Sequence, residues 1–89
     1  MEHHLKINTE FFEPVLRQDK SFEIRKNDRN YLIGDLIILN EWEPSKKQYT
    51  GRKVKGVITY ITDFEQKDNY VVFSFKLIND LSELEKRKK

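Results

Sequence analysis

The run Leu36-Ile37-Ile38-Leu39 is the feature that most restricts the fold of this chain. Four consecutive apolar residues cannot lie on a sheet that has one face in water, so the run predicts a strand buried on both faces. Such a strand belongs inside a small barrel or in a sheet that a helix covers. The turn residues Gly34-Asp35 precede it, and Glu41-Trp42-Glu43 is expected to extend it toward the surface.

Alternation of apolar and polar residues predicts three more strands, over residues 4–7, 52–62 and 70–77. On the longest of these, one face is expected to carry Val54, Gly56, Ile58 and Tyr60. Gly56 is expected to mark a bulge or a close approach of another backbone. On the last strand, the inward residues are expected to be Val71, Phe73, Phe75 and Leu77.

A short helix is predicted to begin at Asn8 or Thr9, because either residue can cap a helix N-terminus. Two apolar pairs within it are four residues apart, and all four residues are expected to form one stripe against the core: Phe11 with Val15, and Phe12 with Leu16. The order of elements is therefore a strand, a helix and then further strands with short links.

This order predicts an α+β fold: a small barrel-like, mostly antiparallel sheet of about five to six strands, with one main helix after the first strand. The length of 89 residues favours a single domain. We place that domain at residues 1–78. A basic C-terminal tail over residues 79–89 is expected to form a short helix around Leu81 and Leu84 or to fray.

The net charge is +2, from 17 basic and 15 acidic residues, but the last four residues, Lys86-Arg87-Lys88-Lys89, are all basic. Without them the balance is 13 against 15, or −2. The body of the protein is therefore not globally basic, so any nucleic-acid binding must depend on a local patch. The chain lacks cysteine, which excludes disulfides and thiolate metal sites and is typical of the cytoplasm, the location we expect.

No apolar run approaches the roughly 20 residues of a membrane span, so no membrane partner is expected. The first residues lack the apolar core of a signal peptide. His3 and His4 are neighbours on a predicted strand and point to opposite faces, so they cannot share a metal ion. We expect no metal and no cofactor. His4 is predicted to be a plain surface histidine, with a position at the edge of a binding cleft as the alternative.

The segment from Lys20 to Arg29 contains six ionisable side chains in ten residues. In a strand, Glu23 and Arg25 share one face, and Lys20 lies in the turn just before it. A carboxylate between two cations would form a pre-organised polar site of the kind that recognises a base or a phosphate. The alternative is a solvated strand face whose surface ion pairs each contribute roughly 0–1 kcal/mol.

A second candidate patch lies between Lys46 and Lys55, a stretch that contains five basic residues and no acid. Tyr49 and Thr50, beside Arg52, are candidates for stacking on a base and bonding to a phosphate. The alternative is that they only shape a solvated hairpin. Trp42 is predicted to pack in the core, with a second stacking surface as the alternative. Asn27, Asp28 and Asp35 are expected to cap turns.

The charged segment, taken with the helix before it and Gly34-Asp35-Leu36 after it, resembles the signature of the ASCH domains. With Tyr49-Thr50-Gly51-Arg52 and Ile58-Thr59-Tyr60-Ile61, the chain more narrowly resembles DUF3850, a phage and bacterial branch of that superfamily. The resemblance spans His4 to about Leu77. Its motifs are specific in combination and weak singly.

The resemblance implies a PUA-like pseudo-barrel whose charged motif lines a cleft beside the helix. It also implies binding of RNA or of a modified nucleotide, with Lys20, Glu23 and Arg25 at the positions of the lysine, acid and arginine of the motif. Where relatives favour glycine before the lysine, this chain has Gln18-Asp19. The full set of candidate ligand-binding residues is Lys20, Glu23, Arg25, Lys26, Asn27, Arg29, Tyr49, Thr50 and Arg52.

Some small ASCH proteins are amidohydrolases that deacetylate acetylated cytidine, and they use a lysine to activate a threonine. Lys20 matches that lysine, but Glu23 stands at the threonine position, and a carboxylate cannot be activated by deprotonation as a hydroxyl can. A Glu23-positioned water, with Lys20 or Arg25 stabilising an oxyanion, is the remaining catalytic route. A binding module without catalysis is therefore the preferred prediction, the hydrolase is the alternative, and a protein-interaction domain is a third possibility. The sequence does not indicate an oligomeric state.

Overall fold

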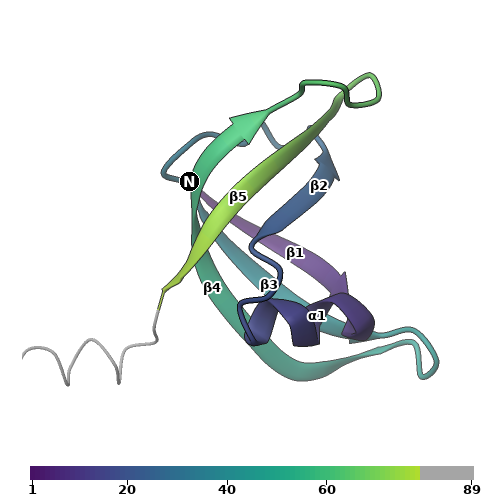
Figure 1. The fold of residues 1–89 in the computed structure, drawn as a ribbon. Coiled ribbons are helices and arrows are strands. Elements are labelled where there is room, and N and C mark those ends of the chain that lie inside the picture. The colour runs from purple at the N-terminus through teal and green to yellow at the C-terminus, as the bar shows by residue number, and fades with distance from the viewer. Residues whose placement is uncertain (79–89) are drawn as a thin grey trace, which may run out of the picture.

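The computed structural model describes residues 1–78. Five strands and one helix follow each other in the order β1, α1, β2, β3, β4, β5 (Figure 1). Their bounds are β1 Glu2–Asn8, α1 Thr9–Leu16, β2 Phe22–Lys26, β3 Leu36–Glu43, β4 Gln48–Thr62 and β5 Tyr70–Ile78. The predicted tail helix around Leu81 and Leu84 lies outside the described residues. None of the described helices is long and apolar enough to cross a membrane.

The five strands form one sheet with the order β1-β3-β4-β5-β2, which curls into a half-barrel (Figure 1). β1 and β3 are parallel, and the other three neighbouring pairs are antiparallel. The parallel pair follows from the connectivity, because α1 and β2 intervene between these strands and allow the chain to cross over. The prediction of a small barrel-like sheet with one main helix is thus confirmed at this level, with five strands.

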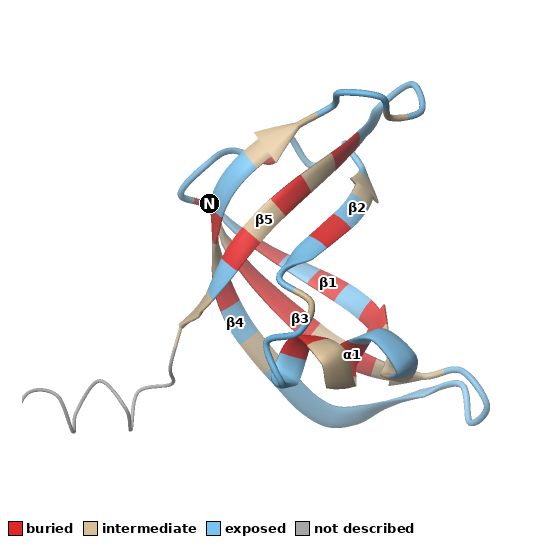
Figure 2. Ribbon diagram, viewed as in Figure 1, coloured by how far each residue is buried: buried red, intermediate tan, exposed pale blue. Residues whose placement is uncertain are grey.

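The apolar run in β3 is buried on both faces, as predicted. Ile37 and Leu39 are fully buried in the core cluster, whereas Ile38 points to the opposite face and is still only 5% exposed. β1 and β5 alternate between buried and less buried residues, as Figure 2 shows. The predicted inward face of β5 is confirmed, with Val71, Phe73 and Phe75 buried and Leu77 packed against them.

The helix turns a narrower face to the core than the sequence predicted. Phe12 and Val15, three residues apart, are buried, but Phe11 is 45% exposed and Leu16 is 41% exposed. The prediction of a four-residue apolar stripe is therefore wrong for half of its members. The reason is geometric: a helix of eight residues rests on β1 and β3 along one side, so only one residue per turn reaches the core.

The start of the helix also differs in detail. Asn8 occupies the capping position without a side-chain cap hydrogen bond. The hydroxyl of Thr9 instead donates to the backbone carbonyl of Trp42 at 3.2 Å. This bond links the first turn of α1 to the end of β3 and contributes to seating the helix at one end of the half-barrel.

Where the long strand pairs with β5, its β-bulge lies at Thr59 and not at the predicted Gly56. Ile58 pairs with Phe75 and Tyr60 pairs with Ser74, so Thr59 is the extra residue. The extra residue reverses the facing of the rest of the strand, which leaves Tyr60 62% exposed and packs Ile61 against the core. The predicted inward position of Tyr60 is therefore wrong.

Gly56 fulfils the other part of its prediction, a close approach of a neighbouring backbone. A Cβ atom at this position would lie 3.2 Å from the carbonyl oxygen of Lys76 and equally close to the ring of Phe75. β4 and β5 can therefore pair at their observed separation because this residue has no side chain.

Candidate functional site

The charged segment after α1 folds so that its acid, not its apolar residues, faces inward. Glu23 is 5% exposed, whereas its neighbours Phe22 and Ile24 are 45% and 55% exposed. Oε1 of Glu23 accepts a hydrogen bond from Nε of Arg25 at 2.9 Å, and Oε2 accepts one from Nζ of Lys20. Both oxygens of the buried carboxylate are therefore paired with cations, in what we call the Glu23 cluster.

The Glu23 cluster is built from two elements that lie on either side of a turn. Strand β2 supplies Glu23 and Arg25, which share a face because they are two residues apart. Lys20 follows the end of α1, and its Nζ also donates to the carbonyl of Phe22 at 2.8 Å. The structure thus brings together the three residues that the sequence placed on one surface. An ammonium group has three N–H donors, so two bonds leave Lys20 one further donor.

Arg25 also connects two strands that are not neighbours in the sheet. β1 and β2 lie at opposite ends of the strand order. Nη2 of Arg25, on β2, donates to the backbone carbonyl of Lys6, on β1, at 2.8 Å. The guanidinium therefore joins the two edges of the half-barrel while it holds Glu23.

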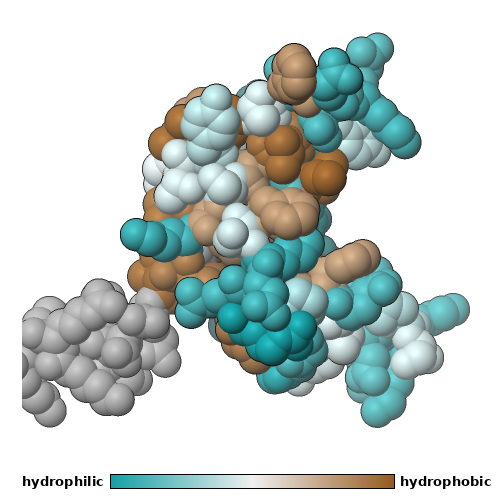
Figure 3. All heavy atoms as spheres, in the orientation of Figure 1, coloured by the Kyte–Doolittle hydropathy of each residue, from teal (hydrophilic) through white to brown (hydrophobic). Residues whose placement is uncertain are grey.

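Two aromatic rings flank the ammonium group of Lys20. Its Nζ lies 5.0 Å from the ring centroid of Phe22 and 5.7 Å from that of Phe11, within the range of cation–π attraction. Each of these rings is 45% exposed. In Figure 3 the outline of the molecule is notched between the part formed by β2 and the part formed by α1. Sequence reasoning missed Phe11 here because its spacing assigned it to the core.

A second buried glutamate lies on β3, the second strand in the sheet order. Glu41 was expected near the surface, but only 1% of it is exposed. Oε1 of Glu41 accepts hydrogen bonds from the Thr50 hydroxyl at 2.6 Å and from Nε of Arg52 at 2.8 Å. Oε2 accepts a bond from Nη2 of Arg52 at 3.0 Å, and the same Nη2 donates to Glu13 of α1. We call these four residues the Glu41 cluster.

The electrostatics of the Glu41 cluster are those of a tightly held anion. Hydrogen bonding from Arg52 is the main reason why the pKa of Glu41 is about 2, below its usual value of 4.5, despite the opposing effect of burial. The two carboxylates in turn raise the pKa of Arg52. The cluster therefore fixes α1 and the β3–β4 hairpin against each other through charged hydrogen bonds.

Three of the predicted ligand-binding residues belong to this second region. Thr50 and Arg52 bind Glu41, and Tyr49 is 56% exposed. The ring of Tyr49 meets that of Trp42 edge to face, with 4.9 Å between centroids. Trp42 is half-buried and lies outside the core cluster, with Nζ of Lys6 4.3 Å from its ring. The structure thus separates these residues from the Glu23 cluster by placing them on the β3–β4 hairpin.

The remaining candidates lie at and after the end of β2. Lys26 is the last residue of the strand and is exposed. Oδ1 of Asn27 accepts a hydrogen bond from the backbone N–H of Tyr31 at 3.2 Å, so its predicted capping role is confirmed. Arg29 lies 4.0 Å from a carboxylate oxygen of Asp28. These residues continue away from Glu23 along the loop.

Sequence reasoning missed one further buried pair. Nε2 of His3, 3% exposed, lies 2.8 Å from Oδ2 of Asp35, and this hydrogen bond is the main cause of the lowered pKa of Asp35. Asp35 also accepts a bond from the N–H of Leu32, which confirms its predicted turn-capping role. His4 is exposed, as predicted. Within residues 1–78 no group of three or more His, Asp or Glu side chains is arranged to hold a metal ion.

Two comparisons with known proteins found matches to this chain. The chain is 42% identical over 71 residues to the "Uncharacterized 12.9 kDa protein in GpA 3'region" of Escherichia phage P2, and the match covers 79% of this chain and 63% of that protein. The chain thus spans less than two thirds of this curated relative. Residues 2–75 match the family described as "Domain of unknown function (DUF3850)". The chain therefore belongs to the DUF3850 family.

Proposed function

We propose that the protein is a binding module that takes a base of RNA, or of a modified nucleotide, into the cleft at the Glu23 cluster. The observation that carries this proposal is the buried carboxylate of Glu23, which holds Lys20 and Arg25 in place, with the ammonium group of Lys20 near two half-exposed phenylalanine rings. The resemblance to ASCH domains and their PUA-like fold supports the same function.

The polar groups of the cluster match what the edge of a base offers. Bases present both donors and acceptors on their edges, and proteins read them with side-chain amides, carboxylates and cations. Lys20 retains one N–H donor, and the cluster contains two cations and one acid, a net charge of +1. It therefore has unused positive charge for a carbonyl-rich base or for an adjacent phosphate.

The apolar groups of the cluster supply stacking surfaces. Phe11 and Phe22 expose nearly half of their surface on opposite sides of Lys20 in the sequence, one from α1 and one from β2. Stacking of a base on an aromatic side chain contributes roughly 1–3 kcal/mol and tolerates different bases. Exposed aromatic residues beside fixed donors are typical of single-stranded nucleic-acid sites.

An amidohydrolase acting on a modified nucleoside has less support. Glu23 stands at the position of the threonine nucleophile of those enzymes, and its two oxygens already accept hydrogen bonds from Lys20 and Arg25. The binding module therefore remains the proposed function.

The proposal can be tested with fluorescence anisotropy of a labelled RNA 12-mer of mixed sequence, using purified wild-type protein and three variants. We expect Lys20→Ala and Phe11→Ala each to weaken binding about tenfold, which is roughly one stacking or charged contact. The matched control is Lys67→Ala, an exposed lysine in the β4–β5 loop. Equal affinities of all four proteins would contradict the proposal, as would the absence of binding.

A mass-spectrometric assay on acetylated cytidine and related nucleosides distinguishes the alternative. Product formation by the wild type that is lost in Lys20→Ala would identify a hydrolase and replace the binding-module proposal. Absence of product together with Lys20-dependent RNA binding is the expected result.

A further inference from the structure

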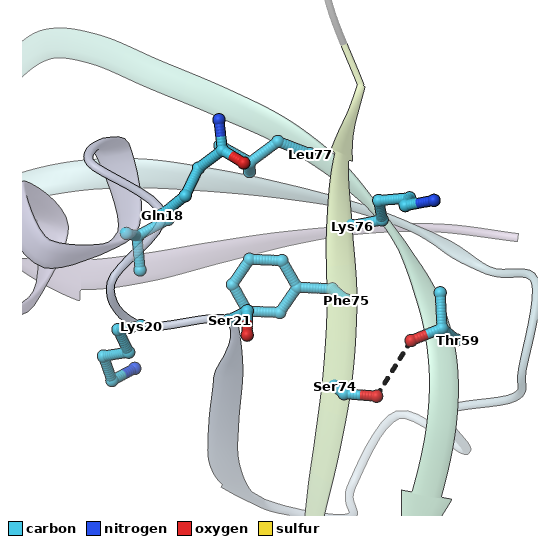
Figure 4. Close-up of a pocket in the computed structure, with 9 residues that line it drawn as sticks. Gln18, Lys20, Ser21, Thr59, Ser74, Phe75, Lys76 and Leu77 are labelled. Atoms are coloured by element: carbon cyan, nitrogen blue, oxygen red, sulfur yellow. Dashed lines mark hydrogen bonds between the residues drawn. The ribbon is translucent and has the colours of Figure 1, made fainter.

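A pocket of about 360 Å³ opens beside the Glu23 cluster, between the turn after α1 and the β4–β5 part of the sheet. Lys20 lines the pocket and also belongs to the Glu23 cluster. The polar residues around the pocket are Gln18, Lys20, Ser21, Thr59, Ser74 and Lys76. In Figure 4, Phe75 and Leu77 extend from β5 toward Gln18 and Lys20, whereas Ser74 and Lys76 extend from the other side of this strand.

The polar side chains that line this pocket are all either neutral or positively charged. It contains two lysines, three hydroxyls and one amide, and none of the residues that line it is acidic. Lysines and hydroxyls are frequent ligands of phosphate oxygens, because they donate hydrogen bonds and the lysines add positive charge. The pocket therefore suits an anion and disfavours a cation.

The β-bulge at Thr59 positions one of these hydroxyls. The extra residue in β4 lets the hydroxyl of Thr59 meet that of Ser74 on β5 at 2.8 Å (Figure 4). In a pair of hydroxyls, one O–H donates to the other oxygen and the second O–H stays available. Bulges are frequent where a strand must redirect a side chain toward a site. Thr59 and Ser74 thus offer a further donor at the pocket.

The edge of β5 adds a backbone donor. Strand β2 pairs with β5 only as far as Phe22 and Ser74, and the N–H of Phe75 then donates to the carbonyl of Ser21 at 3.0 Å. The N–H groups of residues two apart in a strand point in the same direction. The N–H of Leu77, which lines the pocket, is therefore directed to the same edge, where β2 no longer covers the sheet.

We propose that this pocket binds a phosphate group of the ligand whose base lies at the Glu23 cluster, an inference that rests on the proposed function. The ligand class is then a phosphorylated nucleotide or an RNA strand, not a nucleoside or a free base. Lys20 connects the two sites, because it borders the pocket while Glu23 holds its ammonium group. Lys76, Thr59 and Ser74 act at the pocket alone.

The inference is tested by ¹⁵N–¹H correlation spectra of the protein titrated with the four ribonucleosides and with their 5′- and 3′-monophosphates. We expect monophosphates to bind at least tenfold more tightly than nucleosides, with shifts at the amides of Thr59, Ser74 and Lys76. Lys76→Met and Thr59→Val should each lower the affinity for monophosphates about threefold or more and leave the affinity for nucleosides unchanged. The matched control is Lys55→Met, an exposed lysine on β4 outside the pocket.

The outcomes separate the two proposals. Equal affinity for nucleosides and monophosphates, or a difference that Lys76→Met and Thr59→Val leave intact, overturns the phosphate pocket while the base site stands. Shifts at the three pocket amides with inorganic phosphate, without binding of any nucleoside, nucleotide or RNA, support the pocket and overturn the proposed function. Absence of shifts with every probe overturns both.

A further arm identifies the source of the phosphate. A dinucleoside monophosphate carries only an internal diester, whereas a nucleoside monophosphate carries a terminal monoester. Tight binding of both indicates that the pocket takes the backbone of an RNA strand. Tight binding of the monoester alone indicates a free nucleotide.

Discussion

Glu23 and Glu41 are both buried glutamates held by an arginine, yet they are suited to different tasks. Glu41 shares its arginine with a second acid, Glu13, so its cluster contains one cation and two acids, a net charge of −1. Glu23 lies between Lys20 and Arg25, so its cluster has a net charge of +1. In the Glu41 cluster, the two acids neutralise the positive charge of Arg52. In the Glu23 cluster, one positive charge is not neutralised and is available to a ligand.

The comparison shows that a buried carboxylate does not by itself indicate a binding site. What differs is the balance of charge around it and the presence of a pocket and exposed rings beside it. The Glu41 cluster fixes the hairpin to α1, whereas the Glu23 cluster borders the 360 Å³ pocket and the two exposed phenylalanines. We therefore expect substitutions in the first cluster to act mainly on stability and those in the second mainly on binding.

The largest effect is expected from Glu41→Gln. The amide keeps the shape of the side chain but loses its charge, which weakens the hydrogen bonds from Arg52 and Thr50. We expect the free energy of unfolding to fall by about 2–3 kcal/mol, as urea denaturation would measure. Glu43→Gln, a half-buried position on the same strand, is the control. A loss of unfolding free energy smaller than that of Glu43→Gln would show that the contacts of Glu41 do not contribute strongly to stability.

The unfolding free energies of the wild type and Glu41→Gln are also expected to depend differently on pH. The folded pKa of Glu41 is about 2 and its usual value is 4.5, so its ionised form is favoured by folding. The resulting stabilisation is complete above about pH 4.5 and is lost as the pH falls from there to about 2, which corresponds to about 3 kcal/mol at most. The difference between the two proteins should therefore shrink over this interval. A constant difference would contradict the pKa assignment.

Glu23→Gln is expected to have a smaller effect on stability, because the cations that it would leave behind are partly exposed. The side chains of Lys20 and Arg25 are 18% and 23% exposed, so water can solvate them in part. We expect a loss of about 1–2 kcal/mol in urea denaturation. RNA affinity should change more in this variant than in Glu41→Gln once both are compared at a temperature where they are folded. A larger change of RNA affinity in Glu41→Gln than in Glu23→Gln would contradict the proposed difference between the two clusters.

The salt dependence of RNA binding is expected to be shallow. The proposed site, which consists of the Glu23 cluster and the adjoining pocket, supplies positive charge for about two phosphates. The affinity for single-stranded RNA should then fall with a log–log slope of about −1.5 in salt concentration. Anisotropy titrations between low and physiological salt measure this slope. A slope several times steeper would show that the basic hairpin of residues 46–55 takes part.

The smallest effect is expected from Glu13→Gln. This acid pairs with Arg52 at the surface, and its side chain is 44% exposed. Surface ion pairs contribute little, so the free energy of unfolding should change by less than about 1 kcal/mol and RNA affinity by less than twofold. A gain in RNA binding would show that freeing one side of Arg52 creates a second site, which would remove the contrast between the clusters.

Most of the strand pattern could be predicted because it depends on local alternation. The run at Leu36 and the inward face of β5 follow directly from period-two patterns. Glu41 could not be predicted, because its partners Thr50 and Arg52 lie across a hairpin whose register the sequence does not specify. An acid at the end of a strand is normally exposed, and only the observed pairing makes its burial favourable.

The charged residues of the candidate site were predicted from the sequence, whereas the apolar contribution of the helix was missed. Lys20, Glu23 and Arg25 converge because spacing along one strand and one turn is enough to place them. Phe11 depends on how the short helix rotates against the sheet, and Thr59 depends on where the bulge falls. Both are decided by long-range packing, which single-sequence periodicity does not contain. The hydroxyls that line the pocket beside this site were missed for the same reason.

The two edges of the half-barrel are joined by the side chain of Arg25 and the carbonyl of Lys6. Within residues 1–78 the strand pairing contains no ladder between β1 and β2. Among the described residues, no strand–strand hydrogen bond therefore fixes the separation of these two edges. A ligand that draws the guanidinium toward itself competes with the Lys6 carbonyl, so occupancy and the separation of the two edges become linked.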